Sequence, residues 1–469
     1  MSVILIRPRN ANIPKGIVST QYPLNLGYLA SWLTKNKIDV TLLDLEVQEL
    51  HVEEIDVLIR SVKPLLVGLS CVTSTIKAGH DVATSIKERF PDLKIVVGGV
   101  HSTAVPERTL REFPSFDIVV KGEGEESLLE LYNTIADGGD LSKVKGLAYR
   151  VSDSDVLDTG SRPLINDLDC LPFPDRDLLN VDLYKRTHTS RAFSRLNKNI
   201  SEIMTARGCP YSCIFCASKV TFGRYVRYRS VENVIGEMEE CIAKYKTNHF
   251  SMLDDTFTFK KDMLYPVCDY LKTKKVSWDC STRVDRVSEE MLKRIVESGC
   301  EKISFGVESG SEKILKLMGK DISISKIEEA CRLSRKVGVR YLETTFMLGN
   351  HPLETMDDIH DTINLIMKID PDLVVFSITS PFPGTELNRI MKEGGYLGTE
   401  NWDDFIMYGS RPSWRLKYFS IDELKDIQRG FIRKFYLRPS HVLRQIKKIR
   451  GPKEFIYWTR LAVNTIKSF

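Results

Sequence analysis

The first part of the chain alternates short apolar runs with segments whose apolar residues follow helical spacing. The runs have the length and composition of β-strands and lie at residues 3–6, 40–43, 65–70, 95–99 and 118–120. Helical spacing occurs between them, for example at residues 26–33, 76–90 and 125–135. Because strands buried on both faces are continuously apolar, the alternation predicts an α/β fold with a doubly wound parallel sheet over residues 1–150.

A second alternation begins near residue 200. Strand-type runs lie at residues 200–204, 249–253, 276–281, 302–306, 340–347 and 373–378, with helical segments between them. Six such units predict a partial (β/α)6 barrel over residues 196–390, with its active groups on loops at the carboxyl ends of the strands. Residues 151–195 are rich in Pro, Asp and Ser, which indicates a linker and a domain boundary near Leu196.

The last segment, residues 391–469, differs from the rest in charge. From Arg411 to the end there are 15 Lys and Arg against 4 Asp and Glu, an excess of 11, although the whole chain carries only +4. Such a tail favours acidic partners; we expect no stable nucleic-acid partner, and peripheral membrane contact stays open. Residues 421–436 have helical apolar spacing, which predicts a helix packed on the barrel, with a membrane or a partner protein as the alternative surface.

The composition bounds the class of protein. At 469 residues the chain is expected to form two or three domains, and 42% hydrophobic with 28% charged residues is typical of a globular protein. No apolar stretch suffices to span a bilayer, and the first apolar run is too short for a secretory signal, so we expect a cytoplasmic protein. Ten Cys without a disulfide pattern agree with a reducing compartment, and we interpret seven of them as core residues: Cys71, Cys170, Cys241, Cys268, Cys280, Cys300 and Cys331.

The other three cysteines stand close together. Cys209, Cys213 and Cys216 begin in a Gly-Cys-Pro turn and follow at spacings of four and three, so that three thiolates can face one point. A 4Fe-4S cluster normally takes four Cys ligands, so a set of three suggests one iron left open for a group that is not protein. Zinc would need a fourth ligand, and the next candidates, Cys241 and His249, lie well downstream. A purely structural cluster gives no reason for the spacing.

The Cys-x3-Cys-x2-Cys pattern, with Phe215 before the third Cys, resembles the signature of the radical S-adenosylmethionine (SAM) superfamily. In that family the open iron binds SAM, and an electron from the cluster, which implies an external donor, cleaves SAM to a 5′-deoxyadenosyl radical. Asp-Asp-Thr-Phe at 254–257 and Ser-Phe-Gly-Val-Glu-Ser-Gly at 304–310 also resemble family elements. The resemblance implies SAM binding by Phe215, Asp254, Asp255, Thr256, Arg283, Gly306, Glu308 and Ser309.

Two of these residues have alternative interpretations. Arg283 at a predicted strand end can pair with a carboxylate or ribose, but it can also be an exposed surface residue. Glu308 follows near-apolar strand residues, where an unpaired carboxylate is costly unless it meets a partner. A ligand hydroxyl would supply that partner.

Three predicted strand ends in the first domain carry Gly- and Ser-rich turns, each of which is ordinary strand-to-helix chemistry when taken singly. Together, Gly-Gly-x-His-x-Thr, Gly-Glu-Gly-Glu and residues 22–30 resemble the cobalamin-binding domain in front of one large branch of radical SAM enzymes. The resemblance implies cobalamin binding by Ser70, Thr73, Gly98, Gly99, Val100, His101, Gly122 and Glu123. The Asp-x-His-x-x-Gly motif is missing, so we expect no protein imidazole below cobalt and place His101 in the phosphate or nucleotide-tail pocket.

The two resemblances together imply a cobalamin-dependent radical SAM methyltransferase that methylates an unactivated carbon through the 5′-deoxyadenosyl radical and methylcobalamin. The sequence identifies no catalytic acid, base or nucleophile. A cyclase or rearrangement enzyme of the bacteriochlorophyll fifth-ring type uses the same cofactors, whereas the SAM-type elements argue against a simple electron carrier or binding protein. Methylases of this branch act on antibiotics, lipids, phosphonates and a residue of methyl-coenzyme M reductase, and the basic tail favours a large or acidic partner such as a protein.

Overall fold

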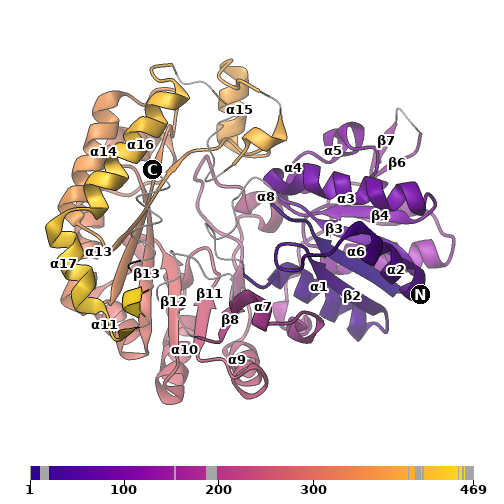
Figure 1. Cartoon of the computed structure of the whole chain (residues 1–469), viewed down its shortest axis with the longest axis horizontal. Helices are drawn as coiled ribbons and strands as arrows, with labels where there is room; N and C mark the ends of the chain where they lie inside the picture. Colours follow the sequence, from indigo (N-terminus) through magenta and orange to yellow (C-terminus); the bar gives the residue numbers. More distant parts are fainter. Residues whose placement is uncertain are drawn as a thin grey trace.

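The computed structural model describes residues 2–10, 21–152, 155–185, 198–399, 401–406, 414, 417–452, 454–456 and 459. Two halves, each with its own sheet, lie side by side, and the amino terminus is at the outer edge of the first (Figure 1). The predicted boundary at Leu196 lies outside the described residues. The division at 1–150, 151–195, 196–390 and 391–469 therefore stays a prediction.

The N-terminal half is built on a seven-stranded sheet with the order β2-β1-β3-β4-β5-β6-β7. Its strands are β1 (Ser2–Arg7), β2 (Asp39–Asp44), β3 (Pro64–Ser70), β4 (Lys94–Gly98), β5 (Ile118–Val120), β6 (Leu147–Arg150) and β7 (Val156–Asp158). The first five pair in parallel, and β6 and β7 add antiparallel strands at one edge. The sheet thus continues beyond residue 150, because β7 comes from the segment expected to be a linker.

Helices cover both faces of this sheet. One core contains Val3 and Leu5 with residues of α1 (Leu24–Lys35) and α6 (Gly124–Ala136). The other contains Ile4 and Ile6 with residues of α2 (Val52–Val62), α3 (Ile76–Arg89) and α5 (Pro106–Glu112), while the short α4 (Val100–Ala104) follows β4. Successive residues of β1 therefore enter opposite cores, which explains the continuous apolar run and confirms the doubly wound parallel fold.

The second half contains a six-stranded, all-parallel sheet with the order β15-β14-β13-β12-β11-β8. Its strands are β8 (Ile200–Ile203), β11 (His249–Met252), β12 (Ser277–Thr282), β13 (Cys300–Glu308), β14 (Tyr341–Leu348) and β15 (Leu373–Ile378). The helices around it are α9 (Val231–Tyr245), α10 (Lys261–Lys274), α11 (Glu289–Glu297), α12 (Glu312–Leu317), α13 (Ile324–Lys336), α14 (Met356–Ile369) and α15 (Glu386–Glu393). In the described residues β8 and β15 do not pair with each other, so the barrel is partial, as predicted.

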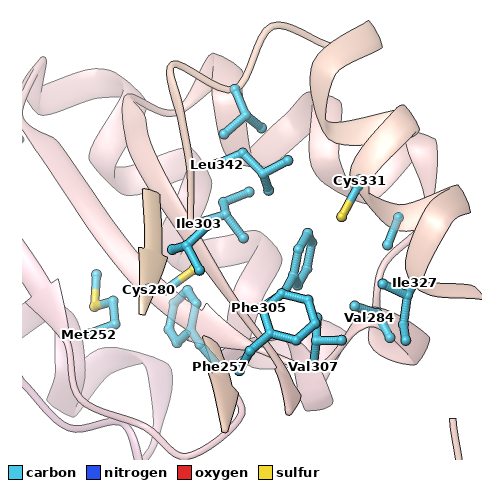
Figure 2. Packing of buried hydrophobic residues seen from close by; sticks show 14 of the residues in the cluster. Met252, Phe257, Cys280, Val284, Ile303, Phe305, Val307, Ile327, Cys331 and Leu342 are labelled. Atoms are coloured by element: carbon cyan, nitrogen blue, oxygen red, sulfur yellow. The ribbon is translucent and has the colours of Figure 1, made fainter. Parts of the chain in front are cut away.

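The main core of this half lies between the sheet and its helices. Figure 2 shows Ile303, Phe305 and Val307 of β13 in the same cluster as Ile327 and Cys331 of α13. Because side chains alternate along a strand, the residues between them, 304, 306 and 308, point to the opposite, inner face. The apolar pattern of β13 therefore places two of the predicted SAM residues inside the barrel.

The C-terminal part divides between the two halves. α16 (Ile421–Tyr436) packs on the barrel core, as predicted for residues 421–436, through Leu424, Phe431, Ile432 and Phe435. α17 (Pro439–Lys448) follows it, whereas Trp402 and Phe405 belong to a core of the N-terminal half. None of the helices described here combines the length and apolar character that a membrane span requires.

Candidate functional site

The Cys loop, defined as residues 208–217, is the first part of a longer segment that begins and ends at one two-stranded sheet. β9 (Ala206–Arg207) pairs with the antiparallel β10 (Arg227–Tyr228), so residues 208–226 form a closed excursion that also contains α8 (Ser218–Phe222). Gly208 begins it with a φ of 100°, and a Cβ there would lie 2.4 Å from the carbonyl oxygen of Tyr225. Gly is therefore required at this position.

The Cys loop lies over the carboxyl ends of the barrel strands. The N–H of Ile214 donates to the carbonyl oxygen of Met318, and its carbonyl oxygen accepts from the N–H of Leu387, both at 2.9 Å. A Cβ on Gly319 would lie 2.9 Å from the carbonyl oxygen of Ser212. These contacts hold the loop between the turn after α12 and the start of α15.

The three thiols of the Cys loop share one electrostatic environment. Burial raises the pKa of Cys209, and it raises the pKa of Cys216 to about 11, with the charges of Asp255 and Cys213 acting in the same direction. The N–H of Ser218 donates to Cys216 Sγ at 3.5 Å. Gathered thiolates repel one another without a cation, and bound iron removes this cost.

That the three thiolates face one point stays a prediction. In the part of the chain that the structure describes, no three His, Cys, Asp or Glu side chains converge closely enough to hold one metal ion. A 4Fe-4S cluster binds each Cys at a different iron and suits a wider spacing. A set of three Cys ligands in one loop suits a 4Fe-4S cluster with one open iron.

Glu308 ends β13 in an uncommon conformation. Its φ is 76°, and the register of β13 on β14 shifts between Gly306 and Glu308. Buried Glu308 meets protein partners: it accepts from Lys320 Nζ at 2.9 Å and from the Thr345 hydroxyl at 3.1 Å, in addition to the ligand hydroxyl that the sequence suggests. A Cβ on Gly306 would lie 2.8 Å from Glu308 Oε1, so Gly306 makes room for the pair. The carboxylate keeps acceptor capacity for a ligand.

Arg283 follows β12 and reaches the same place. It is buried, not a surface residue, and its guanidinium carbon lies 3.7 Å from the ring centre of Tyr211 in the Cys loop. Its Nη2 donates to the carbonyl oxygen of Lys320 at 2.8 Å, and its Nε donates to Asp285 at 2.9 Å. Its buried Nη1 has no hydrogen-bond partner among the described residues. An unpaired buried donor costs about 1–3 kcal/mol, which a polar ligand group would recover.

The two Asp residues after β11 differ in their surroundings. Asp254 is buried and accepts from the N–H and the hydroxyl of Thr205, the latter at 2.7 Å. Burial raises the pKa of Asp254 to about 6 although these hydrogen bonds favour the charged form. Asp255 is exposed and accepts from the Ser218 hydroxyl at 2.5 Å, and its carbonyl oxygen accepts from the Thr256 hydroxyl at 2.8 Å. Asp254 thus joins β8 to β11, whereas Asp255 contacts the start of α8.

Phe215 and Ser309 complete the predicted SAM set. Phe215 packs against the barrel core with Lys320 Nζ 5.9 Å from its ring centre. The Ser309 hydroxyl lies 3.2 Å from the Thr362 hydroxyl of α14 and accepts from the N–H of Ser311. The Ser309 hydroxyl therefore contacts α14 and the turn before α12.

The carboxyl ends of β3 and β4 meet in the N-terminal half, where the sequence predicts cobalamin. Gly99, between Gly98 and Val100, has a φ of 104°, and a Cβ there would lie 2.3 Å from the carbonyl oxygen of Cys71. The Ser70 hydroxyl accepts from Asn25 Nδ2 at 2.7 Å at the end of β3. In a sheet of order 2-1-3-4-5 the ligand crevice lies between β1 and β3, so Ser70 ends a strand at its rim.

Two polar contacts link the neighbouring turns. The Thr73 hydroxyl lies 3.3 Å from His101 Nδ1, and the N–H of Gly122, whose φ is 69°, donates to the Thr103 hydroxyl at 3.0 Å. A Cβ on Gly122 would lie 4.0 Å from the carbonyl oxygen of Thr221 in α8. The turns after β3, β4 and β5 thus form one surface that reaches the excursion containing the Cys loop.

His101 is 1% exposed. Burial, with the charge of Arg108, lowers the pKa of His101 to about 3, so the imidazole is neutral. Its Nε2 is buried and finds no hydrogen-bond partner in the described ranges, and its ring meets the ring of Trp402 edge-on with centres 4.6 Å apart. The Arg108 guanidinium lies 4.2 Å from the Trp402 ring centre. A C-terminal residue therefore covers His101.

Glu123, predicted to bind cobalamin, accepts hydrogen bonds from several protein groups. Its carboxylate accepts from Arg227 Nη1 at 2.7 Å, from Arg207 Nη1 at 3.0 Å and from the N–H of Ile165 at 2.8 Å. Burial alone would raise its pKa, but Arg227 and Arg207 hold the pKa of Glu123 below its usual value. Glu125 accepts from Arg207 Nη2 at 2.6 Å. We call Glu123, Glu125, Arg207 and Arg227 the Glu–Arg clamp, since it ties the N-terminal half to the base of the Cys loop.

The sequence interpretation missed four residues of this region. These are Arg207, Arg227 and Trp402, which each pair with a residue far away in the chain, and Lys320, which pairs with Glu308 twelve residues earlier. The position of Arg207 directly before Gly-Cys-Pro was the one available signal. Nothing local distinguishes the other three from surface or core residues.

Two family models match the chain, the Radical SAM superfamily over residues 203–366 and the B12 binding domain over residues 17–132. An uncharacterised methyltransferase of Pyrococcus horikoshii is 33% identical over 454 residues, which cover 96% of each chain. The anaerobic magnesium-protoporphyrin IX monomethyl ester cyclase of Rubrivivax gelatinosus is 28% identical over 395 residues, 82% of this chain and 69% of the relative. Both resemblances drawn from the motifs are thereby confirmed.

A solved structure shares the arrangement of both halves. The cobalamin-dependent S-adenosylmethionine radical enzyme OxsB, with aqua-cobalamin and S-adenosylmethionine bound, superposes with a TM-score of 0.77 and 19% identity. The match covers 99% of this chain and 71% of that one. It shows that the whole described fold, including the C-terminal part, has a counterpart of known structure.

Proposed function

Because the chain belongs to the family of radical SAM proteins that carry an N-terminal B12 binding domain, we propose that it is a cobalamin-dependent methyltransferase acting on an unactivated carbon. Its cofactors are a 4Fe-4S cluster, SAM and cobalamin. The Pyrococcus horikoshii relative, which matches over 96% of this chain, carries the description of an uncharacterised methyltransferase.

The Glu–Arg clamp is the observation that carries the proposal. Arg207 stands two residues before Cys209 and pairs with Glu123 and Glu125, which follow β5 at the predicted cobalamin edge. α4 also contacts α8, as the adjacent ribbons show (Figure 1). Transfer between two bound groups requires them at a fixed separation, and buried ion pairs supply specific geometry more than net stability.

The residues present fit these cofactors. Cys209, Cys213 and Cys216 would hold three irons of the cluster, while the open donor of Arg283 and the remaining acceptor capacity of Glu308 suit the polar groups of SAM. Gly98, Gly99 and Val100 are half-buried at the predicted cobalamin edge and would line it. When bound, cluster and SAM supply a carbon radical and cobalamin carries a methyl group.

The protein's own part is to position these groups and to limit access of water. Lys320 holds the Glu308 carboxylate and, through its carbonyl oxygen, the Arg283 guanidinium, so one residue fixes two predicted SAM contacts. The Tyr211 ring stacks on the Arg283 guanidinium and so connects Arg283 to the Cys loop. The structure assigns no proton transfer to a side chain.

The proposed substrate is a large or acidic partner, such as a residue of a protein. The positive charge of residues 411–469 supports this class. A second candidate function is cyclisation, favoured by the 28% identity to the cyclase.

Labelled SAM distinguishes these functions. The reconstituted, reduced protein would be incubated with an extract of the source organism and SAM carrying a deuterated methyl group. We expect deuterated methyl in the macromolecular fraction, with S-adenosylhomocysteine and 5′-deoxyadenosine formed in about equal amounts, since two SAM molecules do separate jobs. Deoxyadenosine without labelled product would favour the cyclase. Label confined to small molecules would overturn the substrate class alone.

A further inference from the structure

α17 is amphipathic in the opposite sense to an ordinary surface helix. Its inner face is polar: His441 and Gln445 are buried, Arg444 pairs with Asp370, and Lys448 Nζ lies 2.5 Å from Asp372 Oδ1. Its outer face carries the apolar residues Val442, Leu443 and Ile446, which are 40%, 59% and 51% exposed. A surface helix normally buries its apolar stripe against the core.

Further exposed apolar side chains flank α17 in the sequence. Leu437 precedes the helix, and Phe455 and Ile456 follow it, all of them exposed. Six of the fourteen large apolar side chains that are exposed among the described residues therefore lie between positions 437 and 456. A concentration of this kind marks a contact surface rather than scattered exposure.

The charge around this surface is positive. Lys434 near the end of α16, Lys447 at the end of α17 and Arg450 just after it are exposed, and the described residues 417–452 and 454–456 contain 10 Lys and Arg against 4 Asp and Glu. A second copy of the chain packed about a two-fold axis would bring like charges together. An anionic lipid surface complements both the apolar side chains and the charge, as for helices that lie in a membrane interface.

We infer that the outer face of α17, with Leu437, Phe455 and Ile456, attaches the protein to an anionic bilayer surface. Asp370 and Asp372 precede β15, so the helix is anchored at the end of the barrel opposite the Cys loop. Figure 1 shows α17 at the outer edge of the second half. Attachment there leaves the Cys loop uncovered. The positive charge also supports the proposed substrate class, whereas the exposed apolar side chains play no part in that proposal.

Co-sedimentation of the full chain with vesicles tests the inference. We expect binding to vesicles of phosphatidylcholine mixed with phosphatidylglycerol, weaker binding at high salt, and little binding to phosphatidylcholine alone. Leu443→Glu should lower the partition coefficient at least tenfold, because it places a carboxylate among the inserted side chains. Leu443 is exposed, so folding should be unaffected; circular dichroism checks this.

Val57→Glu is the matched control. Val57 is 68% exposed on α2 in the other half, and its substitution makes the same change in net charge. We expect it to bind vesicles like the unsubstituted protein. Absence of binding to anionic vesicles, or equal losses in both variants, would overturn the inference. So would a dimer in sedimentation velocity that Leu443→Glu dissociates, since the surface would then join two copies of the chain.

Discussion

The two ends of the barrel bury charged side chains in different ways. At the amino ends of the strands, His249 Nε2 lies 2.9 Å from Asp279 Oδ2, and His249 Nδ1 lies 2.8 Å from the Ser277 hydroxyl. Lys198 donates to the Ser277 hydroxyl at 2.8 Å and to Glu301 at 2.5 Å. These polar groups find their partners within the protein.

The carboxyl ends hold one residue in an uncommon backbone conformation and one open hydrogen-bond donor. Glu308 has a φ of 76°, and its carboxylate pairs with Lys320. Arg283 retains a buried Nη1 that is without a partner in the portion described. A closed network stabilises the fold, whereas a strained residue and an open donor on the same barrel indicate a site for a ligand.

The largest effect is expected from Cys213→Ala at the carboxyl ends of the strands. Loss of one thiolate leaves two ligands for the cluster, so reconstituted protein should lose its iron–sulfur absorbance, and SAM cleavage should fall to background. Cys280→Ala is the control: Cys280 is buried in the core of the same half, and its truncation should reduce the free energy of unfolding while the cluster persists. Full iron content in Cys213→Ala would refute the assignment of the Cys loop.

Glu308→Gln should weaken SAM binding by about tenfold to a hundredfold, because a hydrogen bond to a charged group contributes about 1.5–3 kcal/mol. The measurement is equilibrium binding to the anaerobic, cluster-containing protein.

Glu343→Gln makes the same change at the other end of the neighbouring strand. Glu343 is buried near the start of β14, where Lys302 Nζ lies 3.4 Å from its carboxylate. This variant should lower the free energy of unfolding and leave SAM affinity unchanged. Equal losses of SAM affinity in Glu308→Gln and Glu343→Gln would contradict the placement of the ligand site at the carboxyl ends of the barrel strands.

The smallest effect concerns pH. Burial raises the pKa of Asp254 from 3.8 to about 6, so the folded protein binds this proton more tightly than the unfolded chain does. Its contribution to stability is complete below about pH 4 and is lost as the pH rises to about 6, with a slope of at most about 1.4 kcal/mol per pH unit. Chemical denaturation across this range should show the slope in the unsubstituted protein and its loss in Asp254→Asn. Equal slopes would contradict a raised pKa.

The sequence by itself determined the order of strands and helices, because burial on one or two faces leaves a periodic record along the chain. The continuous runs of β1 to β5 predicted the doubly wound sheet, and alternation along β13 is visible in Ile303, Phe305 and Val307. The spacing of Cys209, Cys213 and Cys216 likewise identified the cluster ligands proposed here.

Only the tertiary structure decided which charged groups meet. Glu123 and Arg207 lie in different halves, Lys320 comes from a turn after α12, and Trp402 covers His101 from the C-terminal part. The sequence also did not predict that the apolar face of α17 points outward. It shows an amphipathic helix, but not that the polar face is the one that pairs with Asp370 and Asp372. Local patterns record how much a residue is buried; partners remote in the chain are set by packing, which no short stretch of sequence encodes.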